Sequence, residues 1–512
     1  MRNISFIIIV AAIFVTSCKK ELDQLPISTA TTETFYKQPS DYIQAVNAAY
    51  NSLRNYPNRI LSLSEIRSDN IYPVNDVARD HDPINNFSSN IAPNAFVEEA
   101  WTANYSGIFK ANTLLDQIDK NGSTVITPAL ATRLTAEARF LRAFYYFDLI
   151  RYYGKVPLID RPVVADEVIS IGRSPVDSVY KFVIDDLQYA IANLPANYSG
   201  AFPAYSASDV GRATKYAAQA VLAQVYMTRS GPAYGIEGPG MGLNEWSLAL
   251  PLLNSITTSG QFVFNPSFTS IFSYTNQNPT TNKEAVFNVM YLTGQNPVLG
   301  ASFTWSLAPQ DYFNSLPAGN NPANGTLGFP AVSTNLFTSY AGNDTRRSPT
   351  IHTSPFTYTG ITYTQPFFRK YLDTTKIPAS RFDWGINFIA IRYTDILLLK
   401  AECVLRGAPG SQATDVDAVV NQVRTRAGQA ALANVTLDQL FQERRREFAG
   451  EGLRWFDLQR SGNLLTIMNA WIATEDATLK KMTQVTANHI IYPIPQSQID
   501  AAPGLYTQNP GY

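Results

Sequence analysis

The sequence predicts a mainly α-helical protein, with irregular helix pairs of a tetratricopeptide-like kind and a loop-rich second half that holds a few short strands. Three observations support this fold class. Apolar residues recur at helical spacing through most of residues 41–260. Pro, Asn, Gly and Thr dominate residues 262–387. Helical spacing then returns after residue 394.

The first half of the chain is expected to be a succession of helices. The clearest covers 132–153, where Leu134, Leu141 and Tyr145 fall on one face and Gly154 stands where a glycine commonly ends a helix. Further helices are expected at 41–55, 97–120, 175–193, 212–229 and 246–259. Their period is irregular, so an ordinary helical bundle remains the alternative to a repeat array.

The second half changes character. Short apolar pieces at 285–291 and 388–393 are expected to be strands between long loops. The loops contain too many aromatic residues for a disordered segment, and long ordered loops in compact proteins are usually functional. Helices are expected again at 394–406, 413–427 and 437–462.

Residues 1–17 have the layout of a lipoprotein signal peptide. Arg2 precedes the apolar stretch 4–15, which is too short to span a bilayer, and small residues lead to Cys18. We expect cleavage before Cys18 and lipidation of its thiol, with residues 18–40 as a tether from the membrane. Cys403 is then the remaining cysteine, expected to be a buried thiol without a disulfide partner.

Composition argues against several classes of function. The net charge is −1, so no basic surface for nucleic acid is indicated. Aromatic residues make up 12% and charged residues only 16%, which suits an uncharged polar ligand, although a large aromatic core would also explain it. Metalloprotease, nucleophile-elbow, CxxC and phosphate-loop motifs are all absent, so the sequence gives no motif for catalytic residues of these classes, and no metal or cofactor is expected. A pair of glycosidase carboxylates would leave no such motif.

An arginine-rich segment near the C-terminus carries Glu443, Glu447 and Glu451 at four-residue spacing. Three aligned glutamates could form a metal or acid–base site. The neighbouring arginines instead favour a structural ion-pair network, because the supply of cations matches that of carboxylates. The arginines in question are Arg444, Arg445, Arg446 and Arg454.

Several segments together resemble the SusD/RagB family of outer-membrane nutrient-binding lipoproteins. They are EARFLRA at 137–143 with YGKVPL at 153–158, RYTDILLLKAE at 392–402, ERRREFAGEGLRWFDLQR at 443–460, and YPIP at 492–495 with the terminal NPGY. The resemblance implies one structural unit over 41–512, with a helical part at 41–260 and a part at 261–512 that wraps it with loops before returning to helices. It also implies binding without catalysis.

The resemblance further implies a partner and a place of action. Members of the family act as a lid on a TonB-dependent, SusC-like transporter in the outer membrane, so we expect a lipid-anchored protein facing the exterior that captures a glycan. An oligopeptide-binding lipoprotein of the same transport type is the first alternative, and a surface glycoside hydrolase is the second.

The expected ligand-binding residues lie in two regions. Asp69, Asn70, Tyr72 and His81 occupy the connection between two early helices, where Asp80-His81-Asp82 could ligate a metal, bind a sugar or be a plain polar loop. Trp305 and Tyr312 lie in the loop-rich middle. We predict that the two groups meet on one exposed face, because loops on a rigid scaffold commonly carry binding residues. The alternative is that Trp305 packs beneath its own loop.

Overall fold

The computed structural model describes residues 35–72, 80–317, 331–410 and 413–512. The signal peptide, Cys18 and most of the expected tether lie outside these residues. The helices are α2 (Pro39–Asn51), α3 (Tyr56–Ile60), α4 (Asp82–Asn85), α5 (Ala95–Gln117), α6 (Ser123–Val125), α7 (Pro128–Tyr153), α8 (Ala165–Val168), α9 (Val176–Asn193), α10 (Lys215–Ser230), α11 (Trp246–Thr257), α12 (Phe268–Ile271), α13 (Gln310–Ser315), α14 (Thr334–Ser339), α15 (Arg347–Thr350), α16 (Tyr393–Leu405), α17 (Ala413–Arg426), α18 (Leu437–Phe448), α19 (Arg454–Ser461), α20 (Leu464–Glu475) and α21 (Gln496–Ala501). Short turns of other helical types include η1 (Ser52–Asn55), η2 (Leu61–Glu65), η3 (Ile118–Gly122), η4 (Ala207–Asp209), η5 (Thr304–Leu307) and η6 (Ala487–Ile490).

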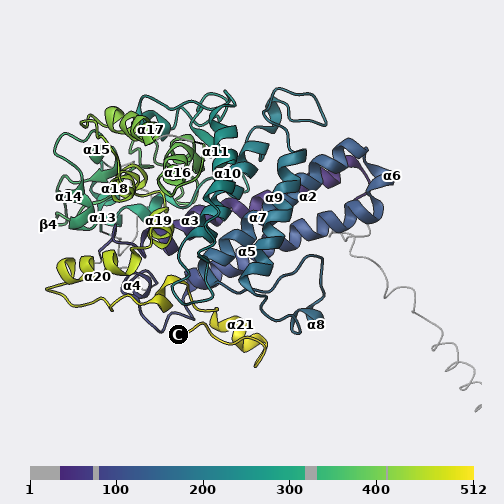
Figure 1. The fold of residues 1–512 in the computed structure, drawn as a ribbon, viewed down its shortest axis with the longest axis horizontal. Helices are drawn as coiled ribbons and strands as arrows, with labels where there is room; N and C mark the ends of the chain where they lie inside the picture. The colour runs from purple at the N-terminus through teal and green to yellow at the C-terminus, as the bar shows by residue number, and fades with distance from the viewer. Residues whose placement is uncertain (1–34, 73–79, 318–330, 411–412) are drawn as a thin grey trace, which may run out of the picture.

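The long helices pack against one another in sequence order, which confirms the mainly helical fold class. Helix α7 lies between α5 and α9, and the packing continues through α10, α11, α16 and α17 (Figure 1). Nearly every side chain from Glu137 to Tyr153 in α7 is buried, because helices cover it on several sides. Gly107 of α5 lets α7 approach closely, since a Cβ there would lie 2.3 Å from the ring of Tyr145.

The strands form small antiparallel sheets that link distant parts of the chain. Strand β1 (Ala285–Val289) pairs with β6 (Phe388–Arg392), so the two strands expected from the sequence are partners. Strands β2 (Ile351–His352) and β5 (Phe367–Phe368) pair, as do β3 (Phe356–Tyr358) and β4 (Ile361–Tyr363). The β1–β6 pair is fully buried beside α7 and α10, whereas β3–β4 is a hairpin with exposed residues.

The helix expected over 437–462 is wrong, because the chain forms two helices, α18 and α19, with a turn between them. Gly450 and Gly452 have φ angles of +79° and +80°, a left-handed conformation that ends a helix and that side chains disfavour. Glu65 holds this turn by accepting hydrogen bonds from both glycine amides, at 2.9 and 2.8 Å. The break therefore depends on a residue that is distant in sequence.

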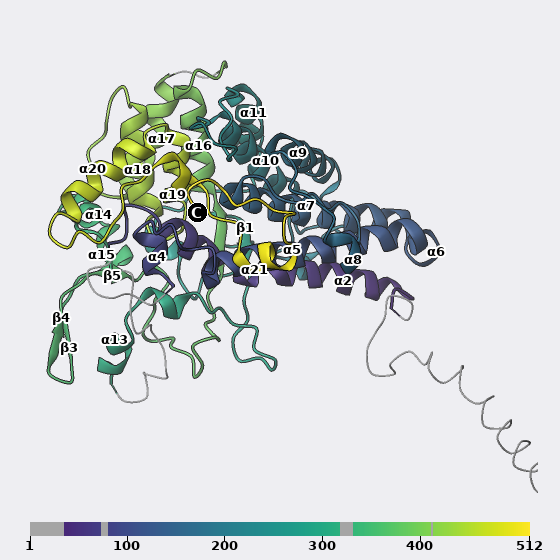
Figure 2. The same cartoon turned by 90° about the horizontal axis from the view of Figure 1, so that it is seen from below.

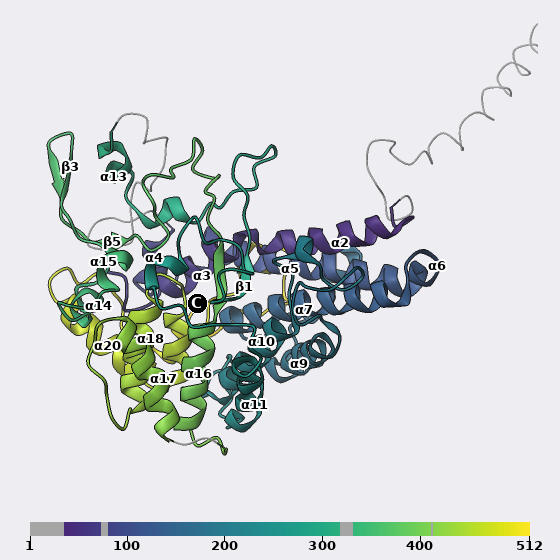
Figure 3. The same cartoon turned by 90° about the horizontal axis from the view of Figure 1, so that it is seen from above.

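Several of the described loops between β1 and β6 gather on one side of the molecule. In Figures 2 and 3 the β3–β4 hairpin, α13 and neighbouring loops project together, away from α11 and α17. Cys403 is buried within α16 and makes no disulfide, as expected. Among the described residues, none of the helices combines the length and apolar character that crossing a bilayer requires.

Candidate ligand-binding face

The residues of the early connection that were expected to bind ligand are buried instead. Asp69 and Asn70 are only 1% and 0% exposed. The Arg454 guanidinium donates to both Asp69 carboxylate oxygens, at 2.8 and 2.9 Å, and the Arg445 guanidinium lies 3.2 Å from the same carboxylate. Burial alone would raise the pKa of Asp69, but Arg445 and Arg454 outweigh it and lower that pKa to about 2. Asn70 donates to Glu65 at 2.7 Å and accepts from Arg445 at 2.8 Å.

Tyr72 and His81 are buried as well. The Tyr72 hydroxyl donates to Asp476 at 2.7 Å. The His81 ring stacks on Phe96 with 4.7 Å between centroids, and burial lowers the pKa of His81 to about 4, so the imidazole is neutral near pH 7. No cluster suited to hold a metal ion occurs among the described residues, those around His81 included. The expectation that these residues share an exposed face with Trp305 and Tyr312 is thus corrected: charge pairing and packing place them inside.

Trp305 forms part of a partly exposed platform together with two residues that the sequence reasoning missed. Its ring meets that of Phe382 edge to face at 6.5 Å, and Phe382 is 47% exposed. The Arg381 guanidinium lies over both rings, 4.9 Å from the Trp305 centroid and 4.8 Å from that of Phe382. We call these three residues the Trp305 platform. Phe382 and Arg381 sit in loop sequence without periodicity, the same signal that singled out Trp305.

The Trp305 platform rests on two loops that are joined by hydrogen bonds. Ala301 and Trp384 exchange backbone hydrogen bonds of 2.8 and 3.1 Å, and the Trp384 side chain is fully buried. Asp383 accepts from the Gly294 amide at 2.9 Å. Gly300 lies against Asp383 so closely that a Cβ there would come within 2.3 Å of its Cα. These contacts fix the backbone on both sides of the exposed rings.

The same loops are attached to the N-terminal helices. Arg54 Nη2 donates to the carbonyls of Val298 and Gly300, at 3.1 and 3.2 Å. The Asn58 amide donates to Ser302 at 2.8 Å, and the Tyr291 hydroxyl donates to the Arg54 carbonyl. A loop face carried on a rigid helical scaffold can keep its side chains in position for a ligand.

Tyr312 belongs to a separate aromatic cluster and is half-buried. Its ring contacts those of His352, Phe356 and Phe367, at centroid distances of 4.9, 5.4 and 5.0 Å. Phe356 also stacks on Tyr363 at 4.8 Å, and the hydroxyl of Tyr363 donates to Asp311 of α13. The cluster fastens the β3–β4 hairpin to α13, so much of the Tyr312 ring is already used in packing.

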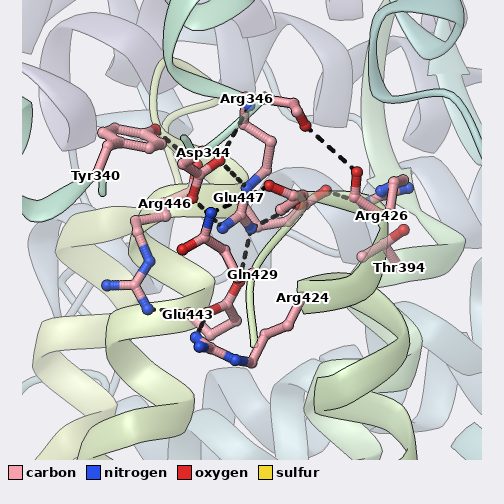
Figure 4. A network of polar contacts seen from close by, with 12 residues as sticks. Tyr340, Asp344, Arg346, Thr394, Arg424, Arg426, Gln429, Glu443, Arg446 and Glu447 are labelled. Atoms are coloured by element: carbon pink, nitrogen blue, oxygen red, sulfur yellow. Dashed lines mark hydrogen bonds and ion pairs between the residues drawn. The ribbon is translucent and has the colours of Figure 1, made fainter. Parts of the chain in front are cut away.

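Glu443 and Glu447 of the arginine-rich segment lie in a buried charge network (Figure 4). Glu443 lies 2.7 Å from Arg346, 3.0 Å from Arg424 and 2.8 Å from Arg446. Because these cations surround Glu443 on three sides, they lower its pKa although burial acts in the opposite direction.

Glu447 has an even more cationic environment. It lies 3.2 Å from Arg346, 3.1 Å from Arg392 and 2.5 Å from Arg426. Burial would raise the pKa of Glu447, but Arg426, Arg392 and Arg346 together lower it to about 2. Glu451 completes the set, 2.8 Å from Lys370 and 2.7 Å from Arg392.

The expected ion-pair network is therefore present, but most of its partners are different. Arg444 pairs with Asp395 and Asp457 instead, at 2.8 and 2.9 Å. Arg454 and Arg445 both pair with Asp69. Among the four arginines expected in the network, Arg446 is therefore the one that pairs with a glutamate of the segment, Glu443. Since each carboxylate already has cationic partners, a structural role fits this cluster better than metal binding or proton transfer.

Comparisons with known proteins agree with this architecture. The sequence profile of the SusD family matches residues 341–512, and a profile described as "Starch-binding associating with outer membrane" matches residues 22–227. The chain belongs to the SusD family. Family members bind and do not catalyse, so this SusD-family chain is a binding protein and not an enzyme.

Relatives match nearly the whole chain. SusD-like protein P25 of Formosa agariphila is 27% identical over 96% of this chain and 95% of the relative. The structure of surface glycan-binding protein A from Bacteroides uniformis is 26% identical with a TM-score of 0.75, covering 92% of this chain and all of that one. Its namesake from Bacteroides thetaiotaomicron is 25% identical with a TM-score of 0.76, covering 93% of this chain and 100% of that one. The SusD fold thus extends through both the helical half and the loop face.

Proposed function

We propose that this SusD-family protein captures a glycan at the cell surface and that the Trp305 platform is part of its binding surface. The observation that carries the proposal is the pair of rings formed by the partly exposed Trp305 and the exposed Phe382, held with Arg381 on a hydrogen-bonded base. The likeness to two structures named surface glycan-binding proteins supports a saccharide as the ligand class.

The chemistry of the platform suits a sugar ring. A flat indole or phenyl face packs against the C–H side of a pyranose and excludes water from it. The Arg381 guanidinium brings several N–H donors to the same place, and sugar hydroxyls accept such hydrogen bonds. Within the described residues the Trp305 indole donates no hydrogen bond, so its N–H is free for a ligand. Tyr312 is a second candidate contact through the part of its ring that the cluster leaves exposed.

We further propose how the binding unit is attached and what it serves. Residues 1–17 direct export, Cys18 carries the lipid, and the residues that follow Cys18 tether the folded unit to the outer membrane; the unit begins slightly earlier than the expected residue 41, because Tyr36 is buried in the core and α2 starts at Pro39. The profile named for association with the outer membrane supports this location. The unit then passes its glycan to a TonB-dependent, SusC-like transporter. Purification of a tagged version in mild detergents should recover a β-barrel partner, and recovery of the protein alone in every detergent would contradict this part.

The binding surface can be tested with one pair of variants and a matched control. A glycan array and a peptide library first identify the ligand, and calorimetry then measures its affinity. Trp305→Ala and Phe382→Ala should each weaken glycan binding by about 2- to 10-fold, because ring stacking is worth roughly 0.5–1.5 kcal/mol beyond area burial. Phe109→Ala removes another exposed aromatic, from α5, and should leave affinity unchanged.

Three outcomes would contradict the proposal, each in a different part. If Trp305→Ala lowers the melting temperature and keeps full affinity, Trp305 is a packing residue and the platform is not the binding surface. If the peptide library yields the ligand and the glycan array yields none, the protein is an oligopeptide binder. Cleavage products after long incubation with the glycan would overturn the assignment as a binding protein.

A further inference from the structure

A concave site is lined in part by the loop that follows β1 and leads along the chain toward Trp305. It is a cleft of about 510 Å³ with three walls. The first is formed by α2 and η1, the second by the chain at the end of η4 and just after it, and the third by the end of β1 and the loop that follows. Its walls are largely apolar, and Met290, Leu292 and Leu299 are 40%, 56% and 39% exposed along it. Small-molecule sites commonly have volumes of about 300–1,000 Å³, apolar walls and a few polar groups.

The cleft contains a buried amide oxygen without a hydrogen-bond partner among the described residues. Asn288 of β1 is only 6% exposed, and its carbonyl oxygen Oδ1 is buried with no partner among the described residues. Its nitrogen Nδ2 makes no hydrogen bond to them either. A buried polar group left without a partner costs about 1–3 kcal/mol. A ligand hydroxyl, which both donates and accepts, would offset that cost.

The cleft also holds a cation that no carboxylate neutralises within the described residues. Arg54 uses Nη2 to hold the carbonyls of Val298 and Gly300. Its Nε is buried without a hydrogen-bond partner. Its Nη1 also makes no hydrogen bond to the described residues, but Nη1 is not a buried atom. Every ion pair that the structure shows in this region involves other arginines.

The two other charged residues that line the cleft, Asp209 and Arg212, belong to a compact ion-pair cluster. Arg212 lies 2.8 Å from Glu137 and 3.0 Å from Asp209. Arg133 contacts the same two carboxylates, each at 3.0 Å. The two arginines and two carboxylates of this cluster have no net charge together, so Arg54 gives the cleft a net positive charge. An anionic group entering the cleft would gain a favourable interaction with Arg54 that a neutral group would not.

We propose that this cleft binds a sugar unit that carries a carboxylate, such as a uronic acid of a glycan. A hydroxyl of the sugar pairs with the Asn288 amide, the carboxylate lies at Arg54, and Met290 and Leu299 cover the ring. The proposal rests on the proposed glycan-binding function and adds the charge class of the ligand. The loop from 290 to 302 leads along the chain from this cleft toward the Trp305 platform.

Titration of the full protein with glucuronate, observed on the ligand by saturation-transfer NMR, tests the cleft directly. We expect glucuronate to bind, glucose to bind at least 5-fold more weakly, and the difference to shrink as salt is raised. Arg54→Gln should abolish the preference for glucuronate, and Arg54→Lys should restore much of it. Asn288→Leu should weaken both sugars, and Phe109→Ala should change neither.

A variant with little risk to folding keeps the test decisive. Met290→Trp enlarges a side chain at the rim that is already 40% exposed, so the protein should fold and the cleft should be blocked. Absence of glucuronate binding in the wild type, equal binding of glucose and glucuronate, or binding that survives Met290→Trp would each overturn the proposal.

Failure of the cleft and failure of the platform are distinguishable. The platform is tested by the affinity of Trp305→Ala for a long glycan. The cleft is tested by the binding of a monosaccharide to Asn288→Leu and Met290→Trp. If Trp305→Ala does not weaken glycan binding, the monosaccharide test of the cleft is still valid. If the monosaccharide does not bind in the cleft, the test of the platform is still valid.

Discussion

Replacing Glu447 by glutamine should destabilise the protein strongly without changing the shape of the side chain. Glu447 is fully buried and lies against Arg346, Arg392 and Arg426. A neutral amide in its place leaves three buried guanidinium groups short of a negative partner. Removing one member of a buried charge network commonly costs about 3–5 kcal/mol.

The pKa of Glu447 gives a second measure of the same interaction. Its lowering from 4.5 to about 2 corresponds, at about 1.4 kcal/mol per pKa unit, to about 3 kcal/mol. Because the pKa is depressed in the folded state, this stability is fully present above pH 4.5 and is lost as the pH falls toward 2. The difference between wild type and Glu447→Gln should therefore be constant at neutral pH and decrease by about 1.4 kcal/mol per pH unit below pH 4.5.

Urea denaturation at pH 7, 5, 4 and 3.5 measures this difference directly. Glu167→Gln is the matched control, because Glu167 also pairs with an arginine, Arg161, but on an exposed surface. Exposed pairs contribute little, so the control should unfold close to the wild-type midpoint. If Glu447→Gln is as stable as the control, or if its deficit does not change with pH, the assigned role of the network is wrong.

Further outcomes follow from other sites. Cys18→Ala should abolish fatty-acid labelling and outer-membrane attachment, and a mutant that still takes up label would contradict lipidation at Cys18. Gly107→Ala should cost about 1–3 kcal/mol in urea denaturation because the added methyl group collides with the buried ring of Tyr145; an unchanged midpoint would show that α5 and α7 have room to separate. Tyr72→Phe removes the hydrogen bond to Asp476 and should cost about 1 kcal/mol with glycan affinity intact, whereas loss of affinity at full stability would return Tyr72 to the binding surface.

The helices were predictable because their signal is local. Apolar spacing and end signals, such as Gly154 after α7, lie within the segment that they specify. The strands β1 and β6 were also visible as short apolar runs, although nothing local indicates that they pair with each other. The break between α18 and α19 was missed because its two glycines follow a helical pattern without interruption and Glu65 secures the turn from the other end of the chain.

The proposed binding face was only partly predictable, since exposure is a tertiary property. Asp69 looks like a ligand contact in a polar loop, yet Arg454, 385 positions away, pairs with it and takes it into the interior. Trp305 was predicted as a ligand contact from its loop context, but its neighbours Arg381 and Phe382 come from a different loop that folding brings alongside. The sequence by itself determined the helical framework and the abundance of aromatic residues in loops. Which polar groups are neutralised inside, and which rings face solvent, was decided by long-range packing, because burial and charge pairing depend on partners that no local pattern records.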